Sequence, residues 1–488
     1  MTSIASMTNM RLKFPGVESL LFKDFSISLN KGEKVLILGP SGSGKSTLLQ
    51  VLTGLIPNTV DVPMKAEELV IPDSWGFLFQ DPDSQFCMPY VDEEIAFVLE
   101  NLQIPREKME KYIEYYLQQV GLDIDEIHTK IQMLSGGMKQ RLAIASVLAL
   151  EPEVLFLDEP TAMLDPEGTK RVWDTIKDVG EDKTVVIVEH KIEQIVDFID
   201  RVILLGENGE IIADGSKQEV FDQYKQVLID QGIWYPNVWE DYVEGKRRDI
   251  PKIEINEEKS SIHLSHFSGY RGKEKTINVK QADAHPGEWI TVLGENGAGK
   301  STLLLALMNL IKTKGTYYVL EQSHKKIKNI ADYVTFVFQN PEFQFITNSV
   351  YEEVAFSLQL EKWGEEEISK RVNELLRVYH LEDHQQNHPY QLSIGQKRRL
   401  SVAASIVKEQ SVLLLDEPTF GQDAKNTFAI LEQLEQLRAE GTTIIMVTHD
   451  LNIVKHFATT VWKINNGELT KESSSSDYTE HQIQPAFS

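Results

Sequence analysis

Short apolar runs alternate with longer segments of helical periodicity along most of the chain. Residues 34–38 (Lys-Val-Leu-Ile-Leu), 154–157 and 184–188 are strand-length apolar runs that end directly at glycine or at charged residues. Residues 47–52, after the first of these runs, have the spacing of a buried helix. Continuous apolar runs of this length are typical of parallel strands covered on both faces. The pattern predicts an α/β fold whose chemistry lies at the carboxyl ends of the strands, where open α/β sheets bind ligands.

The sequence repeats itself once. Five landmarks recur in order: Gly39–Thr47 as Gly294–Thr302, Phe79–Pro82 as Phe338–Pro341, Leu134–Ser135 as Leu392–Ser393, Leu157–Thr161 as Leu415–Thr419, and His190 as His449. Their offsets, from 255 to 259 residues, are too long for a solenoid repeat and match a whole domain. The sequence therefore predicts a tandem duplication of a unit of about 230 residues.

One hydrophobic core cannot organise 488 residues, so the repeat also sets the domain limits. We predict a first domain at 1–230 and a second at 261–471. Residues 231–260 show no sustained periodicity and are predicted to be a linker. Residues 472–488, with four consecutive serines, are predicted to be a disordered tail.

Composition narrows the classes of protein to consider. The net charge of −25, from 49 basic and 74 acidic residues, opposes nucleic acid as the main partner. The single cysteine, Cys87, excludes an intrachain disulfide and fits a reducing compartment. No apolar run approaches the 18 or so residues of a spanning helix, and the first 30 residues lack the pattern of a signal peptide. We expect a cytoplasmic chain whose membrane role, if any, is peripheral.

Two glycine-rich loops of the form Gly-x4-Gly-Lys-Ser carry the clearest chemistry. In such a loop the backbone N–H groups and a helix N-terminus face phosphate oxygens, the lysine reaches the β- and γ-phosphates, and the hydroxyl coordinates Mg²⁺. The candidate nucleotide-binding residues are Gly39, Ser41, Gly42, Gly44, Lys45, Ser46 and Thr47, and then Gly294, Asn296, Gly297, Gly299, Lys300, Ser301 and Thr302. A single match can be a chance glycine turn, but two in repeat register predict two sites for ATP and Mg²⁺.

A pair of adjacent carboxylates ends one buried strand in each repeat. Burial and mutual repulsion make such a pair unfavourable without a nearby cation. We therefore expect Asp158 and Asp416 to organise Mg²⁺, and Glu159 and Glu417 to polarise an attacking water in phosphoryl transfer. The alternative is that these carboxylates only cap a helix. The candidate metal ligands from the loops and the strands are Ser46, Asp158, Ser301 and Asp416.

Residues 134–141 (Leu-Ser-Gly-Gly-Met-Lys-Gln-Arg) and 392–399 (Leu-Ser-Ile-Gly-Gln-Lys-Arg-Arg) resemble the signature motif of ATP-binding cassette (ABC) ATPases. Each lies between the glycine-rich loop and the acidic strand, as the family requires, and the resemblance extends from about residue 10 to residue 470. It implies two P-loop NTPase domains, each with a mainly parallel sheet core, an antiparallel β-subdomain and a helical subdomain.

The resemblance also assigns roles at matching positions. Gln80 and Gln339 would be Q-loop residues that contact the metal and link the nucleotide to a transmembrane partner. His190 and His449 would be switch histidines near the γ-phosphate and, with the two glutamates, form the catalytic set. A lone histidine after a strand is usually a surface residue, so this assignment depends on register. Asp165 and Asp423 fall where the family has D-loop aspartates.

ABC domains trap ATP between two domains packed head to tail, which makes each site composite. The signature helix N-terminus then stabilises charge on the γ-phosphate. The signature residues carried over are Ser135, Gly136 and Gly137 for the Lys300 site, and Ser393 and Gly395 for the Lys45 site.

The second signature departs from the family pattern. Ile394 occupies a glycine position, and its β-branched side chain limits how closely the backbone can approach phosphate. Met138 stands where glutamine is usual, and Gln422 where leucine is usual. We expect the Lys45 site to hydrolyse ATP more slowly than the Lys300 site.

Three aromatic residues are candidates for stacking on adenine. Phe14 precedes its loop by 25 residues and Tyr270 precedes its own by 24. Phe267 competes with Tyr270, and each of the three could equally be a core residue.

The segments after the two Q-loop glutamines, with residues 91–97, 350–356 and 188–191, resemble the ATPases of energy-coupling factor importers. That group takes up vitamins, their precursors, or cobalt and nickel, and includes fused double ATPases assigned to thiamine or hydroxymethylpyrimidine. The acids of 92–94 would suit a basic coupling helix, or they could simply favour a helix dipole.

The resemblance implies the ATP-hydrolysing subunit of an importer, a translocase peripheral on the cytoplasmic membrane face. Its partners would be a transmembrane coupling subunit and a substrate-binding membrane component. One alternative is the soluble tandem cassette protein of the ribosome, but that group has a Thr-Asn-His-Leu-Asp block where this chain has 161–165 and 419–423. The other is a sugar-importer ATPase, in which the second glycine-rich loop is typically degraded. The resemblance implies that selectivity for the cargo lies in the membrane component, because the ATPase contacts only nucleotide and coupling helices.

Overall fold

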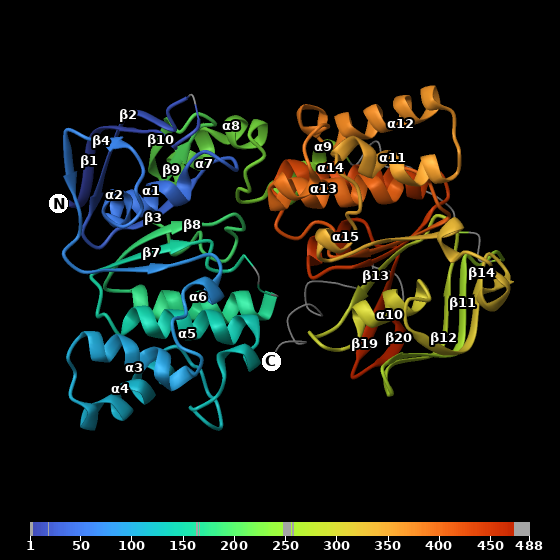
Figure 1. Cartoon of the computed structure of the whole chain (residues 1–488), viewed down its shortest axis with the longest axis horizontal. Coiled ribbons are helices and arrows are strands. Elements are labelled where there is room, and N and C mark those ends of the chain that lie inside the picture. Colours follow the sequence, from blue (N-terminus) through green and yellow to red (C-terminus); the bar gives the residue numbers. More distant parts are fainter. Residues whose placement is uncertain are drawn as a thin grey trace. The chain divides into compact units, whose positions relative to one another are not determined.

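The structure is a computed structural model that describes residues 3–17, 19–162, 164, 166–246, 255 and 258–472. Its internal contacts divide the chain into two compact units, Met1–Val238 and Trp239–Ser488 (Figure 1). Each unit is described by itself below. Of the predicted tail, Glu472 is the last residue of β20 and residues 473–488 lie outside the described residues, as do residues 247–254, 256 and 257 of the predicted linker.

The first unit begins with β-structure and alternates strands and helices afterwards. Its strands are β1 (Ser3–Leu12), β2 (Phe22–Asn30), β3 (Lys34–Leu38), β4 (Met64–Lys65), β5 (Glu68–Val70), β6 (Trp75–Leu78), β7 (Val154–Asp158), β8 (Thr184–Val188), β9 (Arg201–Leu205) and β10 (Ile211–Ser216). Its helices are α1 (Lys45–Leu52), α2 (Leu55–Asn58), α3 (Val91–Asn101), α4 (Arg106–Gln119), α5 (Gly136–Leu148), α6 (Pro166–Gly180), α7 (Lys217–Gln223) and α8 (Lys225–Asp230), with 3₁₀ turns at Pro82–Ser84 and Ile131–Met133.

Two sheets organise this unit. Six strands run in the order β10-β9-β3-β8-β7-β6, and all neighbours except β10 and β9 are parallel. A separate antiparallel sheet pairs β1 with β2, β4 and β5. The helices α3 and α4 pack with α5 and lie beyond it, away from the sheet (Figure 1). The unit therefore has a parallel core, an antiparallel β-subdomain and a helical subdomain, as predicted.

The second unit repeats this order after a helix of its own. Its strands are β11 (Ile262–Arg271), β12 (Glu274–Ala284), β13 (Trp289–Leu293), β14 (Lys312–Val319), β15 (Gln322–Ser323), β16 (Val334–Val337), β17 (Val412–Asp416), β18 (Thr443–Val447), β19 (Thr460–Asn465) and β20 (Glu468–Glu472). Its helices are α9 (Val238–Lys246), α10 (Lys300–Leu307), α11 (Val350–Leu360), α12 (Glu365–Val378), α13 (Ile394–Ile406), α14 (Ala424–Ala439) and α15 (Leu451–His456). Five 3₁₀ turns lie at His324–Lys326, Ile330–Asp332, Pro341–Phe343, Glu382–His384 and Pro389–Gln391.

One sheet runs through the whole second unit, in the order β15-β14-β11-β12-β20-β19-β13-β18-β17-β16. The segment from β19 through β13, β18 and β17 to β16 is parallel, whereas β15, β14, β11 and β12 pair antiparallel. The parallel pairing of β12 with β20 joins the two regions. Both units are thus α/β domains of the predicted class.

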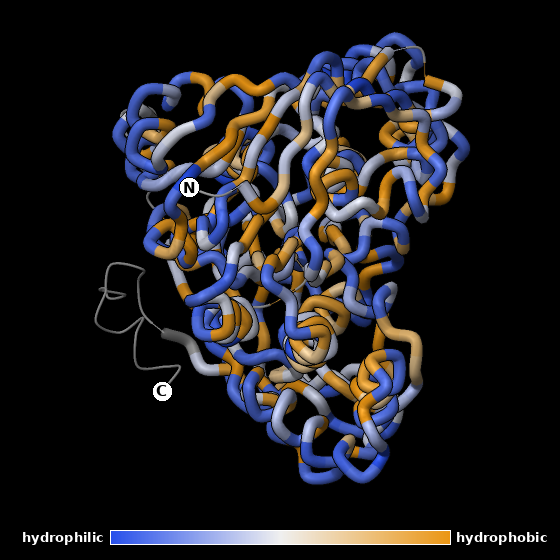
Figure 2. Tube along the Cα trace, turned by 90° about the vertical axis from the view of Figure 1, so that its left-hand side faces the viewer, coloured by the Kyte–Doolittle hydropathy of each residue, from blue (hydrophilic) through white to orange (hydrophobic). Residues whose placement is uncertain are grey.

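Each core forms where α1 or α10 packs between the parallel strands and the antiparallel strands. In the first unit Leu48, Val51 and Leu52 are fully buried against Phe22 and Ile37. In Figure 2, orange hydrophobic stretches run along several strands, and blue hydrophilic stretches predominate at the outer edges. Because the glycine-rich loop precedes α1 directly, this packing fixes the position of the loop.

The stretch predicted as an irregular linker contains the helix α9. Trp239 is only 3% exposed and contacts Phe428 of α14 edge to face, with ring centroids 5.0 Å apart. Tyr242 stacks on the same Phe428 ring at 3.9 Å. Aromatic side chains spaced i and i+3 lie on one face of a helix, so this packing explains helix formation in a segment that lacks an apolar repeat.

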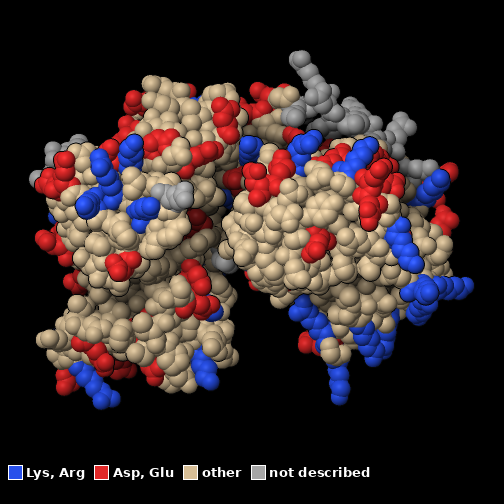
Figure 3. Space-filling view, turned by 45° about the horizontal axis from the view of Figure 1, so that its top comes forward, with Lys and Arg blue, Asp and Glu red and all other residues tan. Residues whose placement is uncertain are grey.

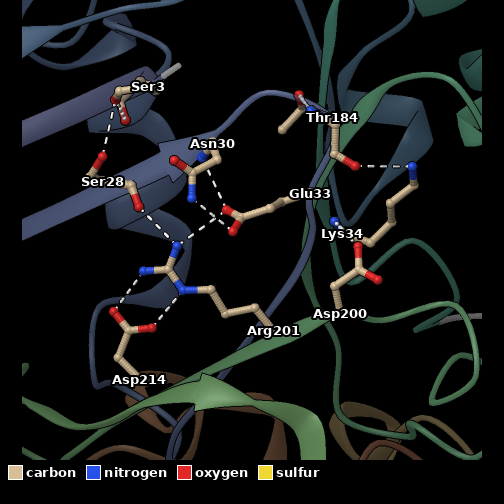
Figure 4. Close-up of polar contacts among 11 residues, drawn as sticks. Ser3, Ser28, Asn30, Glu33, Lys34, Thr184, Asp200, Arg201 and Asp214 are labelled. Atoms are coloured by element: carbon tan, nitrogen blue, oxygen red, sulfur yellow. Dashed lines mark hydrogen bonds and ion pairs between the residues drawn. The ribbon is translucent and has the colours of Figure 1, made fainter. Parts of the chain in front are cut away.

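A network around Arg201 joins the two sheets of the first unit (Figure 4). Its guanidinium of β9 makes two bonds to Asp214 of β10, at 2.6 and 2.7 Å. It also donates to the carbonyl of Ser28 in β2 and to Glu33, at 3.0 and 3.2 Å. Glu33 in turn accepts from the backbone and side chain of Asn30. A bidentate, half-buried arginine therefore ties the antiparallel subdomain to the parallel core.

In the described part of the chain, no helix is both long and apolar enough to cross a membrane. Figure 3 shows one face of the molecule, on which acidic and basic side chains are interspersed with broad uncharged areas.

Candidate functional site

In the first unit the glycine-rich loop connects β3 to α1. Gly42 and Gly44 have φ of 87° and 93°, in the left-handed region that favours glycine. A Cβ on Gly44 would lie 2.7 Å from the ring of Phe22, so a larger residue would displace the core aromatic. Ser41 and Gly42 are exposed, Thr47 is the third residue of α1, and the loop presents the N-terminus of α1 to solvent.

The lysine of this loop folds back over it. Lys45 is 7% exposed, and its Nζ donates to the carbonyls of Gly39 and Pro40 at 2.8 and 2.9 Å. These bonds hold the ammonium group against the backbone carbonyls at the start of the loop. The arrangement fits a polyphosphate, since its oxygens could take over the role of the two carbonyls as acceptors.

A hydroxyl and a carboxylate meet beside the loop. Ser46 Oγ donates to Asp158 Oδ1 at 2.9 Å. Burial raises the pKa of Asp158 to about 6, and the adjacent charge of Glu159 adds to that shift, although the bond from Ser46 and the charge of Lys45 oppose it. Hard oxygen donors of this kind are suited to Mg²⁺, whose charge would relieve the cost of keeping Asp158 ionised.

Glu159 lies at the centre of the first site. It has φ of 47°, unusual for a residue with a side chain, and its N–H donates to Val188 of the neighbouring strand at 2.8 Å. Gln80 Nε2 donates to its Oε2 at 2.7 Å, and His190 Nε2 lies 3.0 Å from its Oε1. Burial opposes ionisation, but the bond to His190 and the charges of His190 and Lys45 outweigh it and lower the pKa of Glu159. A carboxylate kept ionised here can accept a proton from water.

His190 and Glu159 each shift the pKa of the other toward its charged form. Burial disfavours the charged imidazole, but the hydrogen bond to Glu159 and the negative charges of Glu159 and Glu189 outweigh it and raise the pKa of His190.

Glu189 is a site residue whose role sequence reasoning missed. It is 4% exposed, accepts a short hydrogen bond from Thr161 Oγ1, and accepts from the backbone N–H of His190 at 3.0 Å. Burial raises its pKa to about 7. The available signal was a carboxylate directly after the run 184–188, which is apolar from Val185 on, because a buried carboxylate needs hydrogen-bond partners.

The second unit repeats this geometry. Gly297 and Gly299 have φ of 82° and 107°, and a Cβ on Gly294 would lie 2.3 Å from the carbonyl oxygen of Ile464. Lys300 Nζ donates to the carbonyls of Gly294 and Glu295 at 2.7 and 3.0 Å. Asn296 is exposed, and Ser301 and Thr302 follow Lys300 in α10.

The acidic strand of the second unit also meets its loop. Burial raises the pKa of Asp416, while the hydrogen bond from Ser301 and the charge of Lys300 lower it. Glu417 has φ of 52°, and its N–H donates to Val447 at 3.0 Å. His449 Nε2 lies 3.5 Å from Glu417 Oε1. Gln339 follows β16, and its backbone carbonyl accepts from Arg398 at 2.8 Å.

The signature residues lie at the N-termini of α5 and α13. Ser135 Oγ accepts from the N–H of Met138 at 3.4 Å. Ser393 and Gln396 form a reciprocal capping box, with bonds of 3.3 and 2.9 Å. Gly136 and Gly137 are the first residues of α5, and Gly395 is the second of α13. Ile394 is 60% exposed at the start of its helix.

The three candidates for stacking on adenine differ in how exposed their side chains are. Phe267 is fully buried in the core of the second unit, which excludes it as a stacking residue. Phe14 is 38% exposed, and Tyr270 is partly exposed with Lys314 Nζ 5.3 Å from its ring centroid. Asp165 lies outside the described residues, whereas Asp423 caps α14 by accepting from the N–H of Asn426 at 2.8 Å.

The family model for the ABC transporter matches this chain twice, at residues 22–162 and 277–420. These two regions contain both glycine-rich loops, both signatures and both acidic strands.

Curated relatives match along nearly the whole chain. A Bacillus subtilis protein named "Putative HMP/thiamine import ATP-binding protein YkoD" is 37% identical over 94% of this chain and 89% of its own length. A Caldanaerobacter subterraneus protein named "Putative ABC transporter ATP-binding protein TTE1589" is 34% identical over 91% of this chain and 86% of its own length.

Solved structures share the fold. The archaeal ribosome recycling factor aABCE1, in complex with a ribosomal stalk protein, gives a TM-score of 0.64 at 21% identity, over 94% of this chain and 89% of its own. A structure titled RNase-L Inhibitor gives a TM-score of 0.66 at 20% identity, over 98% of this chain and 92% of its own. Together, the repeated motifs, the matching site geometry and these relatives show that the chain is an ATPase that belongs to the ATP-binding proteins of the ABC transporter family.

Proposed function

We propose that this chain is the ATP-hydrolysing subunit of a membrane importer of the energy-coupling factor type, for a vitamin, a vitamin precursor or a metal ion. The observation that carries the proposal is the 37% identity, over nearly the whole length, with a relative whose name specifies HMP/thiamine import. The complete set of site groups in both units supports two active ATP sites.

Each glycine-rich loop would bind the phosphates of one ATP. Lys45 and Lys300 would exchange their bonds to loop carbonyls for bonds to the β- and γ-phosphates, and the N-termini of α1 and α10 would face the same oxygens. The exposed faces of Phe14 and Tyr270 would offer stacking surfaces for adenine.

The oxygen donors beside each loop would hold Mg²⁺. Ser46 and Asp158 are already in contact, as are Ser301 and Asp416, and Gln80 and Gln339 stand at the ends of neighbouring strands. When bound, Mg²⁺ would neutralise charge on the transferred phosphoryl group.

Glu159 and Glu417 would act as general bases toward the attacking water. Both are held by a backbone bond to the next strand, and both face a histidine. His190 and His449 would keep each glutamate oriented and stabilise charge near the γ-phosphate, because a histidine paired with a carboxylate stays available as a donor.

We further propose that the signature residues complete the site of the opposite unit, head to tail. In that arrangement Ser135, Gly136 and Gly137 would meet the Lys300 loop, and Ser393 and Gly395 would meet the Lys45 loop. Gln80 and Gln339 would pass nucleotide state to a transmembrane coupling subunit that also contacts a substrate-binding membrane component. The chain would then be peripheral on the cytoplasmic face of the cell membrane.

The two alternative functions are a protein that acts on the ribosome and the ATPase of a sugar importer, and each predicts a different partner in the experiment below. The likeness to the ribosome recycling factor structure, at 21% identity, and to the structure titled RNase-L Inhibitor, at 20% identity, concerns the fold alone. A sugar-importer ATPase would be expected to have a degraded second loop, whereas here Lys300 and Asp416 retain the geometry of the first site.

The decisive experiment is purification of the tagged chain from detergent-solubilised membranes of its own cells, with partners identified by mass spectrometry. The proposal predicts a small set of integral membrane proteins that are retained with the wild type. Recovery with ribosomes, or with a sugar permease, would contradict it. A Lys45→Ala/Lys300→Ala double variant provides the control, because it should keep the partners while losing ATP hydrolysis.

A further inference from the structure

A buried arginine lies behind the second site. Arg398 is in the second turn of α13, the helix that begins at the signature serine Ser393 (Figure 1). It is 6% exposed, which is rare for arginine unless its guanidinium is bonded and its charge compensated.

The guanidinium bridges two segments of the site that are far apart in sequence. One terminal nitrogen donates to the backbone carbonyl of Glu417, and the other donates to the backbone carbonyl of Gln339 at 2.8 Å. The ring of Phe420 lies 5.9 Å from the guanidinium carbon. Burial lowers the pKa of Arg398, and the negative charges of Glu417 and Asp416 oppose this shift.

These bonds act on a backbone that needs support. Glu417 has φ of 52°, a conformation that costs free energy in a residue with a Cβ and persists only where its surroundings fix it. Its N–H donates to Val447, and its C=O accepts from Arg398 and from the N–H of Phe420 at 3.2 Å, so the peptide groups on both sides of its Cα are held. These bonds fix the point on the backbone from which the carboxylate extends.

The first unit solves the same problem differently. Gln140, which is 258 residues earlier, occupies the equivalent place in α5 at 2% exposure, and no described residue pairs with its Nε2. Ala162 stands where the second unit has Phe420. There Glu159 has backbone bonds to Val188 and Ala162 but, within the described part of the chain, no arginine on its carbonyl, and its side chain is held by Gln80 and His190.

We propose that Arg398 is a positioning residue for ATP hydrolysis at the Lys300 site, which locks the backbones of Glu417 and Gln339 to the signature helix α13. A rigid link of this kind moves the general base, the Q-loop and the signature helix as one body. The planar fork of arginine suits two carbonyl acceptors at once, and lysine cannot reproduce it. This inference rests on the proposed role of Glu417 as general base.

The test compares steady-state hydrolysis by the full-length chain and two variants, Arg398→Gln and Arg398→Lys. Arg398→Gln supplies the residue of the first unit, and we expect kcat to fall about 10- to 100-fold while KM for ATP stays within about twofold, since misplacing a catalytic group affects the chemical step more than binding. Arg398→Lys keeps the charge but not the fork, so its kcat should lie between those of Arg398→Gln and the wild type.

Arg438→Gln is the matched control. Arg438 is also 6% exposed, also lies in the second unit, and also donates to a backbone carbonyl, that of Gly287 at 3.0 Å. We expect it to lower the melting temperature by as much as Arg398→Gln does, with kcat changed by no more than about twofold. Equal losses of kcat in the two variants, or an unchanged kcat in Arg398→Gln, would overturn the inference.

Hydrogen–deuterium exchange gives a readout that does not require turnover. Arg398→Gln should raise the exchange of amides around Glu417 and Gln339, and Arg438→Gln should not. Unchanged exchange around Glu417 in Arg398→Gln would also overturn the inference. A wild-type chain without ATPase activity would contradict the general-base role of Glu417, whereas the exchange result decides separately whether Arg398 fixes its backbone.

Discussion

His190 Nε2 lies 3.0 Å from Glu159 Oε1, whereas the equivalent distance from His449 to Glu417 is 3.5 Å. The residues that precede the two histidines also differ. Glu189 accepts from the backbone of His190 in the first unit, whereas the second unit has Thr448, which accepts instead from the N–H of Asp450 at 3.1 Å. The two sites therefore share their residue types but hold the histidine in different ways.

The first prediction concerns the histidines. His190→Ala removes the hydrogen bond and the charge that keep Glu159 ionised despite burial. In a Glu417→Gln background, where turnover comes from the Lys45 site, we expect His190→Ala to lower kcat at saturating ATP by about 100-fold, the lower end of the range for lost acid–base groups. His449→Ala in a Glu159→Gln background is the matched variant and should lower the kcat of the Lys300 site by a smaller factor, because its pair is longer. A larger loss in His449→Ala would contradict this reading of the distances.

The second prediction concerns asymmetry between the general bases. Because Ile394 stands at the signature that would face the Lys45 site, that site should hydrolyse ATP more slowly. Glu417→Gln should then remove most of the turnover, and Glu159→Gln a smaller share, in steady-state assays of the full-length chain. Ile394→Gly should raise turnover by relieving the restriction on the backbone. Equal losses in the two glutamine variants would count against asymmetry.

The third prediction is a pH dependence of stability. The folded state raises the pKa of Glu189 from 4.5 to about 7, so between these values the folded chain holds a proton that the unfolded chain has released. Stability therefore falls as pH rises through this window, by about 3 kcal/mol at most for this group.

Glu189→Gln should remove that contribution. The free energy of unfolding of Glu189→Gln, minus that of the wild type, should increase from pH 5 to pH 7.5, as measured by urea denaturation at each pH. The variant thus gains stability relative to the wild type over this range. Glu207→Gln, at an exposed position, is the control and should show a constant difference. Parallel curves for Glu189→Gln and the wild type would show that Glu189 is ionised in the folded state.

The fourth prediction concerns helix capping at the signatures. Ser393 and Gln396 satisfy two backbone groups reciprocally, whereas Met138 cannot return the bond that Ser135 makes. Ser393→Ala should therefore destabilise the second unit by about 1–2 kcal/mol, and Ser135→Ala the first by less than about 1 kcal/mol. Denaturant titrations of the two variants check the order, and a larger cost for Ser135→Ala would contradict it.

Much of the fold could be predicted because its signals are local. The apolar runs 34–38 and 184–188 correspond closely to β3 and β8, and the glycine-rich loops stand between strand and helix as expected. A glycine that needs positive φ and a carboxylate at the end of a strand can both be recognised from a few adjacent residues.

The rest depends on partners distant in sequence. The segment of α9 has no apolar repeat, and its packing surface, Phe428, lies almost 190 residues later. Phe267 and Tyr270 have similar spacing to the second loop, and only the packed sheet shows which of them is buried. The bonds of Arg398 to Gln339 and Glu417 likewise form only because α13 packs beside the ends of β16 and β17. The sequence of any one of these segments does not show that packing.

We expect one chain to hold two ATP molecules, one at each glycine-rich loop. The most direct measurement is equilibrium dialysis of radiolabelled ATP, with Mg²⁺, against the full-length Glu159→Gln/Glu417→Gln variant, which should bind without turnover. We predict two ATP per chain, falling to one or to cooperative loss of both when Lys45 or Lys300 is changed to alanine. Saturation at a single ATP per chain in the parent double variant would contradict the account.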